Sequence, residues 1–229
     1  MMSLENRNQN ILLTVDIIVF SVMHDKLNVL LIKRKNPPFQ GEYALPGGFV
    51  KDDEDLQEAA RRELVEETNV KNIFMKKLNV YGKVDRDPRG RVVSAAYIAL
   101  IDHEKFQLKA TTDALKAEWI PYEHIKVLAF DHKKILSEAL KELRYDVQTT
   151  NIASQLLPNR FTLTELQRLY ETILNQELDK RNFRKKIKTF EILKPLNETK
   201  MEGAHRPAQL FSFKEKDYQP LKDKIKVFL

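Results

Sequence analysis

The sequence predicts an α/β sandwich followed by a small, basic second domain. Apolar segments typical of strands alternate with amphipathic segments typical of helices up to about residue 146, which favours an α/β architecture. Residues 1–150 contain 23 Lys and Arg and 23 Asp and Glu, whereas residues 151–229 contain 16 and 10, so the net charge of +6 lies in the last third. This excess indicates either an anionic partner or a solvated Lys-rich surface. We expect a first domain over 1–146, a linker over 147–158, and a second domain over 159–229.

The first domain is expected to begin with two hydrophobic strands. Ile, Val and Leu dominate both segments, and a polar turn at 24–26 separates them, as in neighbouring strands of a mostly buried sheet. Residues 37–48 contain too many Pro and Gly residues for a helix or a strand and are expected to form a loop. The predicted elements are strands over Ile11–Phe20, Leu27–Ile32, Phe74–Lys83 and Arg91–Ile101, and helices over Leu56–Thr68 and from a cap at Asp131 to about Tyr145.

A set of charged and small residues stands at fixed spacings between Gly48 and Val70. Gly48, Glu54, Arg62-Glu63-Leu64, Glu66-Glu67 and Val70 fit the pattern Gx5Ex7REUxEExGU, where U is a bulky aliphatic residue. The segment therefore resembles the Nudix box, and every charged position matches. Asn69 stands where the family has Gly, just past the predicted helix end. A left-handed backbone is usual there and Asn tolerates it, so we expect the geometry to survive.

The glutamates of this segment are candidate metal ligands. Glu63 and Glu67 lie one turn apart on one helix face, with Glu66 beside them. Such a face can be a solvated acidic surface, or it can bind a divalent cation. An all-oxygen ligand set favours Mg²⁺ or Mn²⁺, which would share its coordination sphere with substrate phosphates. The resemblance implies that the Gly48 carbonyl, Glu63 and Glu67 hold the metal, with Glu66 as a further ligand or as the base. It also implies that Arg62 orients the carboxylates and that Glu54 supports them. The expected catalytic residues are Arg62, Glu63, Glu66 and Glu67.

The segment from Asp85 to Ser94 is a candidate ligand-binding loop. Nudix substrates are nucleoside diphosphates linked to another group, and this segment looks like the corresponding stretch of Nudix proteins that act on or sense ADP-ribose. Arginine binds phosphate in bidentate fashion, and Gly90 permits close backbone approach. An ordinary basic hairpin turn is the alternative. The candidate substrate-binding residues are Arg34, Arg89, Arg91 and Glu54.

The C-terminal third has the pattern of a winged helix-turn-helix. Thr162 and Glu165 form a capping box that opens one helix, and Asp179 caps a second over Lys180–Phe190. Two short strands, Glu191–Lys194 and Gln209–Phe213, bracket an expected wing. DNA binding is favoured over a basic hairpin that packs on the first domain or on a protein partner. The candidate DNA-binding residues are Lys180, Arg181, Arg184, Lys185, Lys188 and Arg206.

Over nearly its whole length the chain resembles the NrtR family, the Nudix-related transcriptional regulators of bacteria. The Nudix box, the Arg86–Arg91 stretch, Phe130–His132, Leu156–Pro158 and Leu178–Lys185 carry the resemblance. It implies a Nudix α/β/α sandwich with a mixed sheet and a C-terminal winged helix-turn-helix. It also implies a homodimeric repressor, often of NAD metabolism, that releases double-stranded DNA on binding ADP-ribose. Many such regulators have an incomplete Nudix box, whereas this sequence retains all of its carboxylates. Mg²⁺-dependent ADP-ribose pyrophosphatase activity is therefore the alternative.

Composition excludes several other classes of protein. The sequence has no cysteine, which excludes a disulfide framework and a thiolate zinc site and fits a reducing cytoplasm. The most apolar run, Ile11–Val22, is interrupted by Asp16 and is too short to cross a bilayer. We therefore expect a cytoplasmic protein without a membrane partner.

Overall fold

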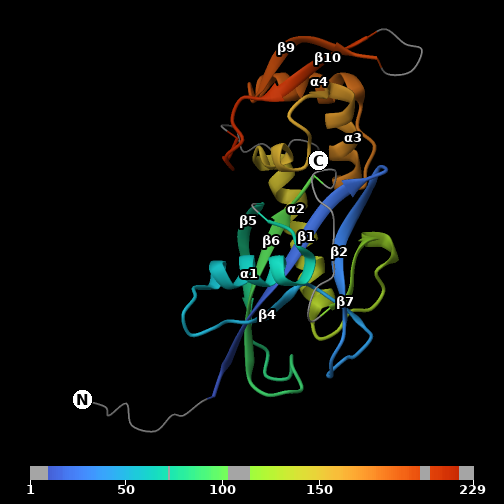
Figure 1. Ribbon diagram of the computed structural model, residues 1–229. Helices are drawn as coiled ribbons and strands as arrows, with labels where there is room; N and C mark the ends of the chain where they lie inside the picture. Colours follow the sequence, from blue (N-terminus) through green and yellow to red (C-terminus); the bar gives the residue numbers. More distant parts are fainter. Residues whose placement is uncertain (1–9, 72, 103–113, 202–206, 222–229) are drawn as a thin grey trace.

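The computed structural model describes residues 10–71, 73–102, 114–201 and 207–221. In this part of the chain, seven strands form one mixed sheet (Figure 1). β1 pairs in parallel with β6 and antiparallel with β2 and β4, so it lies at the centre. The strands are β1 (Leu12–Met23), β2 (Lys26–Arg34), β3 (Tyr43–Ala44), β4 (Gly47–Phe49), β5 (Phe74–Tyr81), β6 (Val92–Leu100) and β7 (Ala114–Pro121).

One long helix covers each face of the sheet, as the predicted sandwich requires. Val15, Ile17 and Val19 pack with the buried face of α1 (Leu56–Thr68). Ile18 and Phe20, which point to the opposite side, pack with α2 (His132–Thr149). Because β1 is buried on both faces, its apolar residues occupy successive rather than alternate positions, apart from the buried polar residues Thr14, Asp16 and Ser21.

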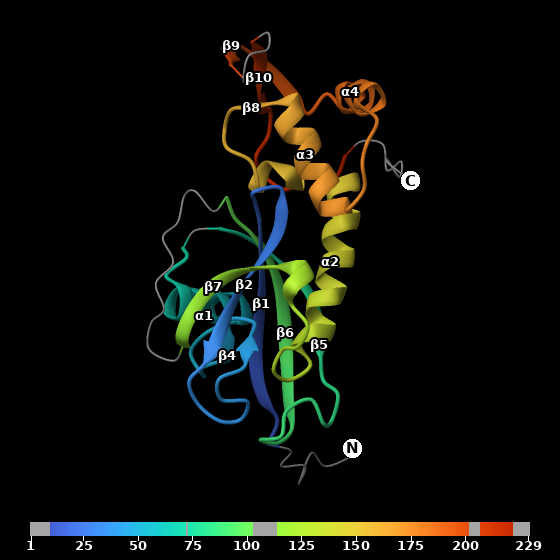
Figure 2. The same ribbon diagram turned by 90° about the vertical axis from the view of Figure 1, so that its right-hand side faces the viewer.

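The second domain is a helix-turn-helix followed by a two-stranded wing (Figure 2). Thr162 and Glu165 form the predicted capping box, and the Asp179 side chain accepts from the amide of Asn182. Buried Tyr170 packs edge to face against Phe183 at 5.3 Å and joins the two helices. The elements are β8 (Phe161–Thr162), α3 (Leu163–Leu174), α4 (Lys180–Thr189), β9 (Leu193–Lys200) and β10 (Ala208–Phe213); the short 3₁₀ helices η2 (Tyr122–His124) and η3 (Ile152–Gln155) precede them.

Several sequence predictions need correction. The segment expected to be a loop contains β3 and most of β4. These short strands form because β3 pairs with β2 and β4 pairs with β1, and Gly residues do not prevent these hydrogen bonds. β7 was not predicted, and β9 extends to Lys200, well beyond the strand expected to end at Lys194. Asp131 stands at the start of α2, yet its side chain does not cap the helix, because it pairs with Arg86 instead.

The predicted linker over 147–158 contains ordered structure. α2 continues to Thr149, four residues past its expected end, and η3 follows directly. Val147, Ile152 and Ala153 are fully buried, so this segment packs into the core that the two domains share. The exact domain boundaries stay a prediction. No helix in the described ranges combines the length and the hydropathy that spanning a membrane requires.

Candidate ligand cavity and DNA interface

The carboxylate helix begins and ends as the sequence predicts. Asp55 accepts from the amides of Gln57 and Glu58 at 2.7 and 2.8 Å, which fixes the first turn of α1. Asn69 adopts a left-handed conformation with φ 62°, and its amide donates to the carbonyl of Val65. Asn in place of the family's Gly therefore ends the helix in the expected way.

Arg62 lies at the centre of the acidic cluster. Its Nε donates to Glu54 at 2.8 Å, and its Nη1 donates to Glu63 at 2.6 Å and to Glu66 at 3.0 Å. Its Nη2 also donates to the carbonyl of Phe49 at 3.0 Å. Hydrogen bonding from Arg62 lowers the pKa of Glu54 to about 2. Arg62 thus bridges Glu54, Glu63 and Glu66, while its role in orienting metal-binding carboxylates, and the supporting role of Glu54, stay predictions.

The glycines of β4 bring the backbone against two of the glutamates. A Cβ on Gly48 would lie 2.3 Å from a carboxylate oxygen of Glu63, so a larger residue there would displace the Glu63 carboxylate. The amide of Gly47 donates to Glu67 at 2.8 Å. Burial raises the pKa of Glu63, although hydrogen bonds from Arg62 oppose this. The carboxylates of Glu63 and Glu67 therefore converge on the Gly47–Gly48 backbone, as the metal hypothesis requires.

The residues present fit a hard divalent cation that is shared with a ligand. Among the described residues, no three His, Cys, Asp or Glu side chains are grouped to hold an ion by themselves. Mg²⁺ in proteins is commonly bound by one or two carboxylates together with substrate phosphates. Glu63 and Glu67, which lie against the Gly47–Gly48 backbone, fit that kind of incomplete protein site, while Glu66, with a side chain 47% exposed, lies toward solvent.

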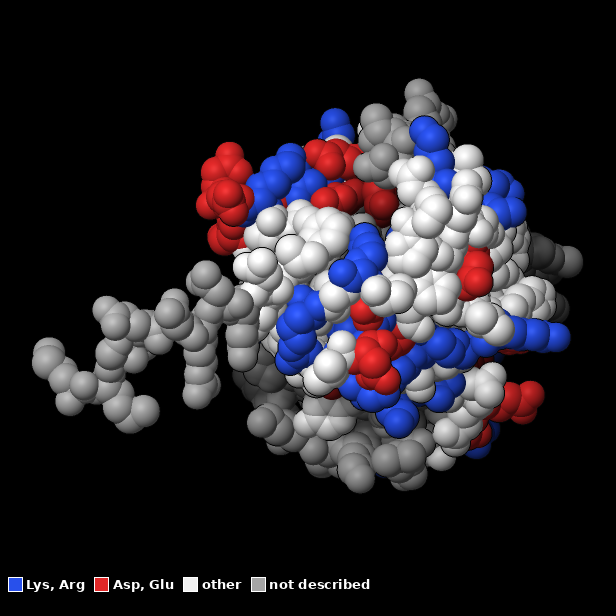
Figure 3. All heavy atoms as spheres, turned by 90° about the horizontal axis from the view of Figure 1, so that it is seen from below, with Lys and Arg blue, Asp and Glu red and all other residues white. Residues whose placement is uncertain are grey.

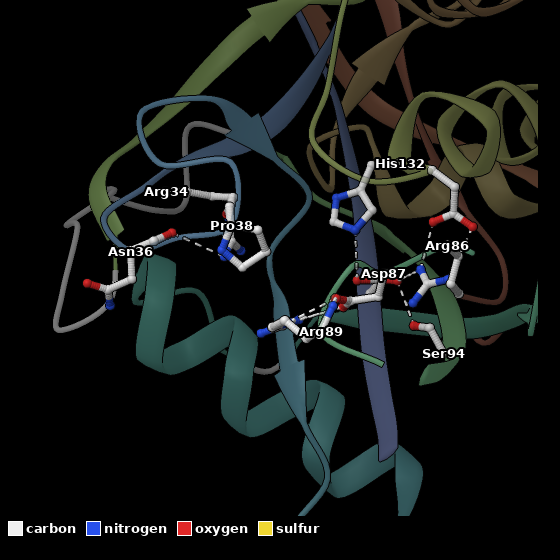
Figure 4. A network of polar contacts seen from close by, with 10 residues as sticks. Arg34, Asn36, Pro38, Arg86, Asp87, Arg89, Ser94 and His132 are labelled. Atoms are coloured by element: carbon white, nitrogen blue, oxygen red, sulfur yellow. Dashed lines mark hydrogen bonds and ion pairs between the residues drawn. The ribbon is translucent and has the colours of Figure 1, made fainter. Parts of the chain in front are cut away.

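A cavity of 470 Å³ joins the acidic cluster to a group of arginines and aromatic rings. The Arg89 guanidinium lies 4.8 Å from the ring centroid of Phe49 and 5.4 Å from that of Phe130, and Arg34 lies 4.8 Å from Phe130. Asp87 accepts from Arg89 through both carboxylate oxygens (Figure 4). Figure 3 shows basic and acidic side chains adjacent on the face seen from below, at the end of the molecule opposite the wing.

The cavity includes most, but not all, of the predicted site residues. Arg34, Arg62, Arg89 and the three glutamates line it. Arg91 and Glu54 do not line it: the Arg91 guanidinium donates to the carbonyl of Gly82, and the Glu54 carboxylate accepts from Arg62. Arg34 also donates to the carbonyl of Pro38 at 2.8 Å, which holds it in the cavity rather than extended along the surface (Figure 4).

Sequence reasoning missed a buried polar network behind the cavity. Arg86 donates to Asp16 at 3.1 Å and to Asp131 at 2.7 Å, and Ser94 donates to Asp16 at 2.6 Å (Figure 4). His132 accepts from the amide of Leu45 at 3.0 Å and approaches Asp16 at 3.3 Å. Burial by itself would raise the pKa of Asp16, but His132, Arg86 and Ser94 outweigh it and lower the pKa to about 2. The one available signal was that Asp16 interrupts an otherwise apolar strand.

The second domain presents a basic helix. Phe183 and Ile187 are buried against α3, whereas Lys180, Arg181, Lys185 and Lys188 are exposed. Arg184 is half-buried and its Nε has no partner among the described residues. Arg206 lies outside the described residues. The exposed cations lie on the second helix of the motif, which is the helix that enters the major groove in proteins of this architecture.

Comparisons with known families and proteins agree with this geometry. Residues 12–143 match the NUDIX domain and residues 153–213 match the NrtR DNA-binding winged helix domain. The chain is 38% identical over 211 residues to the ADPR responsive transcriptional repressor NtrR of Acinetobacter baylyi, covering 90% of this chain and 84% of that protein. The chain belongs to the NrtR family.

Other relatives of this NrtR-family chain match it over most of its length or over the Nudix domain. Shewanella oneidensis NrtR, in a crystal structure with a 27mer DNA, has a TM-score of 0.78 and 32% identity over 88% of this chain and 93% of that chain. Its NUDIX domain, complexed with ADP ribose, has a TM-score of 0.55 and 34% identity over 58% and 88%. ADP-ribose pyrophosphatase of Methanocaldococcus jannaschii is 46% identical over 113 residues, covering 49% of this chain and 66% of that protein.

Proposed function

We propose that this protein is a transcriptional repressor that binds operator DNA through α4 and its wing and releases it on binding ADP-ribose in the Nudix cavity. The observation that carries the proposal is the presence, in one chain, of a cation-lined and carboxylate-lined cavity and a basic recognition helix. The repressor of Acinetobacter baylyi is named as responsive to ADPR, which supports the same pairing of ligand and DNA.

The chemistry of the cavity fits a nucleoside diphosphate. Arg34 and Arg89 provide guanidinium groups that can bind phosphate oxygens in bidentate fashion. The rings of Phe49 and Phe130 provide apolar surface beside them. ADP-ribose, which is bound to the NUDIX domain of the Shewanella relative, contains a diphosphate and a flat adenine ring.

The chemistry of α4 fits double-stranded DNA. The Shewanella relative, which is similar over 88% of this chain, was crystallised with a 27mer DNA. Two copies related by a two-fold axis would place two recognition helices about one helical turn of DNA apart, so we include a homodimer in the proposal.

A second function is Mg²⁺-dependent hydrolysis of ADP-ribose to AMP and ribose phosphate. The specific observation in its favour is the complete set of carboxylates, and the Methanocaldococcus relative is named as an ADP-ribose pyrophosphatase. Glu63, Glu67 and the Gly48 carbonyl would hold the cation, which when bound would offset charge on the diphosphate. Glu66, at the exposed edge of the cluster, is the candidate base for an attacking water.

One experiment separates the two activities. ADP-ribose is titrated, with and without Mg²⁺, into the protein bound to its own upstream DNA, and both the gel shift and the nucleotide products are followed. Release of DNA with intact ADP-ribose supports sensing alone. Appearance of AMP over many turnovers supports catalysis. Absence of binding to the upstream DNA at low salt would refute the regulatory proposal.

A further inference from the structure

α2 connects the ligand cavity with the DNA-binding domain. Three consecutive residues at its start reach into the cavity region: Phe130 lies beside Arg34 and Arg89, Asp131 pairs with Arg86, and His132 approaches Asp16. The helix then runs for 18 residues, about 27 Å at 1.5 Å per residue. Figure 2 shows it extending from the Nudix sheet to α3.

The far end of α2 is anchored to the second domain in two ways. Arg144 donates through Nε to the carbonyl of Ile173, in the last turn of α3, at 2.9 Å. Asp146, which is buried, pairs with Lys76 of β5 at 2.6 Å and accepts from the Tyr218 hydroxyl at 3.2 Å. One carboxylate thus connects the Nudix sheet, α2 and the segment that follows the wing.

That segment, residues 214–221, is here called the C-terminal strap. It leaves β10 and returns along the end of α2, outside both the NUDIX and the winged helix matches. Asn151 binds the strap through its backbone and its side chain. Its backbone amide donates to the carbonyl of Gln219 at 3.1 Å, and its side-chain oxygen accepts from the amide of Gln219 at 2.8 Å. Its Nδ2 donates to the carbonyls of Glu215 and Asp217 at 3.2 and 2.8 Å. The amide of Leu221 donates to the carbonyl of Thr149 at 2.8 Å, and the Leu221 side chain is buried.

Beyond these hydrogen bonds, the two domains share a hydrophobic core that includes Leu166, Leu169 and Ile173 of α3. A cavity of 770 Å³ separates part of α3 from α2 and from the turn between β1 and β2. The charged residues that line it include Lys26, Glu123, Arg144, Arg168 and Glu171, and Lys26 pairs with Glu123 at 2.8 Å. The winged helix is therefore held to the Nudix domain by the shared core, by α2 and by the strap, which adds directed hydrogen bonds to the apolar contacts.

We propose that the strap, fastened by Asn151 and Tyr218, couples the winged helix to the Nudix cavity, so that a ligand changes DNA affinity through α2 and the strap. This inference rests on the proposed function, because it assumes that binding of ADP-ribose weakens the binding of DNA. Asn151 and Tyr218 are positioning residues, since they contact neither the cavity nor α4 in the described structure.

The test compares the full-length protein with three variants. Asn151→Ala removes the side chain that binds three strap groups, and Tyr218→Phe removes the hydrogen bond to Asp146. Tyr145→Phe is the matched control, because Tyr145 also belongs to the end of α2 but is 54% exposed. For each variant, the DNA dissociation constant is measured with and without saturating ADP-ribose, and ADP-ribose affinity is measured without DNA. Hydrogen exchange at Gln219 and Leu221 reports whether the strap has detached.

We expect ADP-ribose to weaken DNA binding of the wild type by about 5- to 150-fold. In Asn151→Ala this ratio should fall to less than about twofold, with faster exchange at Gln219 and Leu221 and with ADP-ribose affinity unchanged. Tyr218→Phe should give an intermediate ratio, and Tyr145→Phe the wild-type ratio. The ratio cancels any change in basal DNA affinity. If the wild type shows no ratio, the proposed function fails and the coupling with it. If the wild-type ratio persists while the strap exchanges freely, or if neither strap variant changes it, only the coupling is overturned.

Discussion

Removing the charge of Arg86 should destabilise the protein by about 3 kcal/mol. The Arg86 side chain is 3% exposed and pairs with Asp16 and Asp131, whose side chains are 8% and 19% exposed. Taking one partner from a buried ion pair costs roughly 3 to 5 kcal/mol, because the other charge is left without compensation. Since His132 and Ser94 still contact Asp16, we place the Arg86→Met variant at the lower end of this range.

The assay is denaturant unfolding together with thermal unfolding. About 3 kcal/mol corresponds to a fall of roughly 6 to 12 °C in Tm for a chain of this size. Lys83→Met is the matched control, because Lys83 pairs with Asp85 in the same loop but both side chains are more than 70% exposed. An exposed pair contributes at most about 1 kcal/mol, so the control should unfold close to the wild type. If Arg86→Met were destabilised by less than about 1 kcal/mol, the network would not stabilise the fold as argued.

Three further predictions concern pH, catalysis and DNA. The pKa of Asp16 is lowered from 3.8 to about 2, so ionised Asp16 stabilises the folded state by about 2 kcal/mol. This stabilisation is fully present above pH 4 and is lost as pH falls toward 2. Acid unfolding of the wild type compared with Asp16→Asn measures it. Glu67→Gln should lower any Mg²⁺-dependent release of AMP by about 100-fold or more, because it removes a charged ligand of the expected cation, while the amide oxygen still accepts from the Gly47 amide. Unchanged turnover would contradict the metal site. Lys185→Gln should lower the slope of log Kd against log salt concentration by about 0.9, because one DNA phosphate then has no cation opposite it. The control is Lys134→Gln, on the exposed surface of α2, which should leave the slope unchanged.

The Nudix helix shows why some of the site could be predicted. Its start, its end and its charged face are set by neighbours within one or two turns, such as Asp55 with Glu58 and Asn69 with Val65. Spacing along a helix converts directly into position in space, so Glu63 and Glu67 could be placed on one face from the sequence. The same reasoning located the capping box of α3 and the cap of α4.

The arginines behave differently, because long-range partners decide where they point. Arg89 is held in the cavity by Asp87 and two aromatic rings, whereas Arg91, two residues later, turns to the carbonyl of Gly82. Nothing in the spacing distinguishes the two. Arg86 was part of the predicted loop, yet its partners Asp16 and Asp131 are 70 and 45 residues away in sequence.

The sequence by itself determined the fold class, the carboxylate helix and the basic helix-turn-helix, because each depends on local periodicity and capping. Only the tertiary structure decided that Asp16, Arg86, Asp131 and His132 form one buried network and that the chain after the wing returns to α2. These contacts join residues far apart in sequence, and their free energy comes from burial and from partners that only the folded chain brings together.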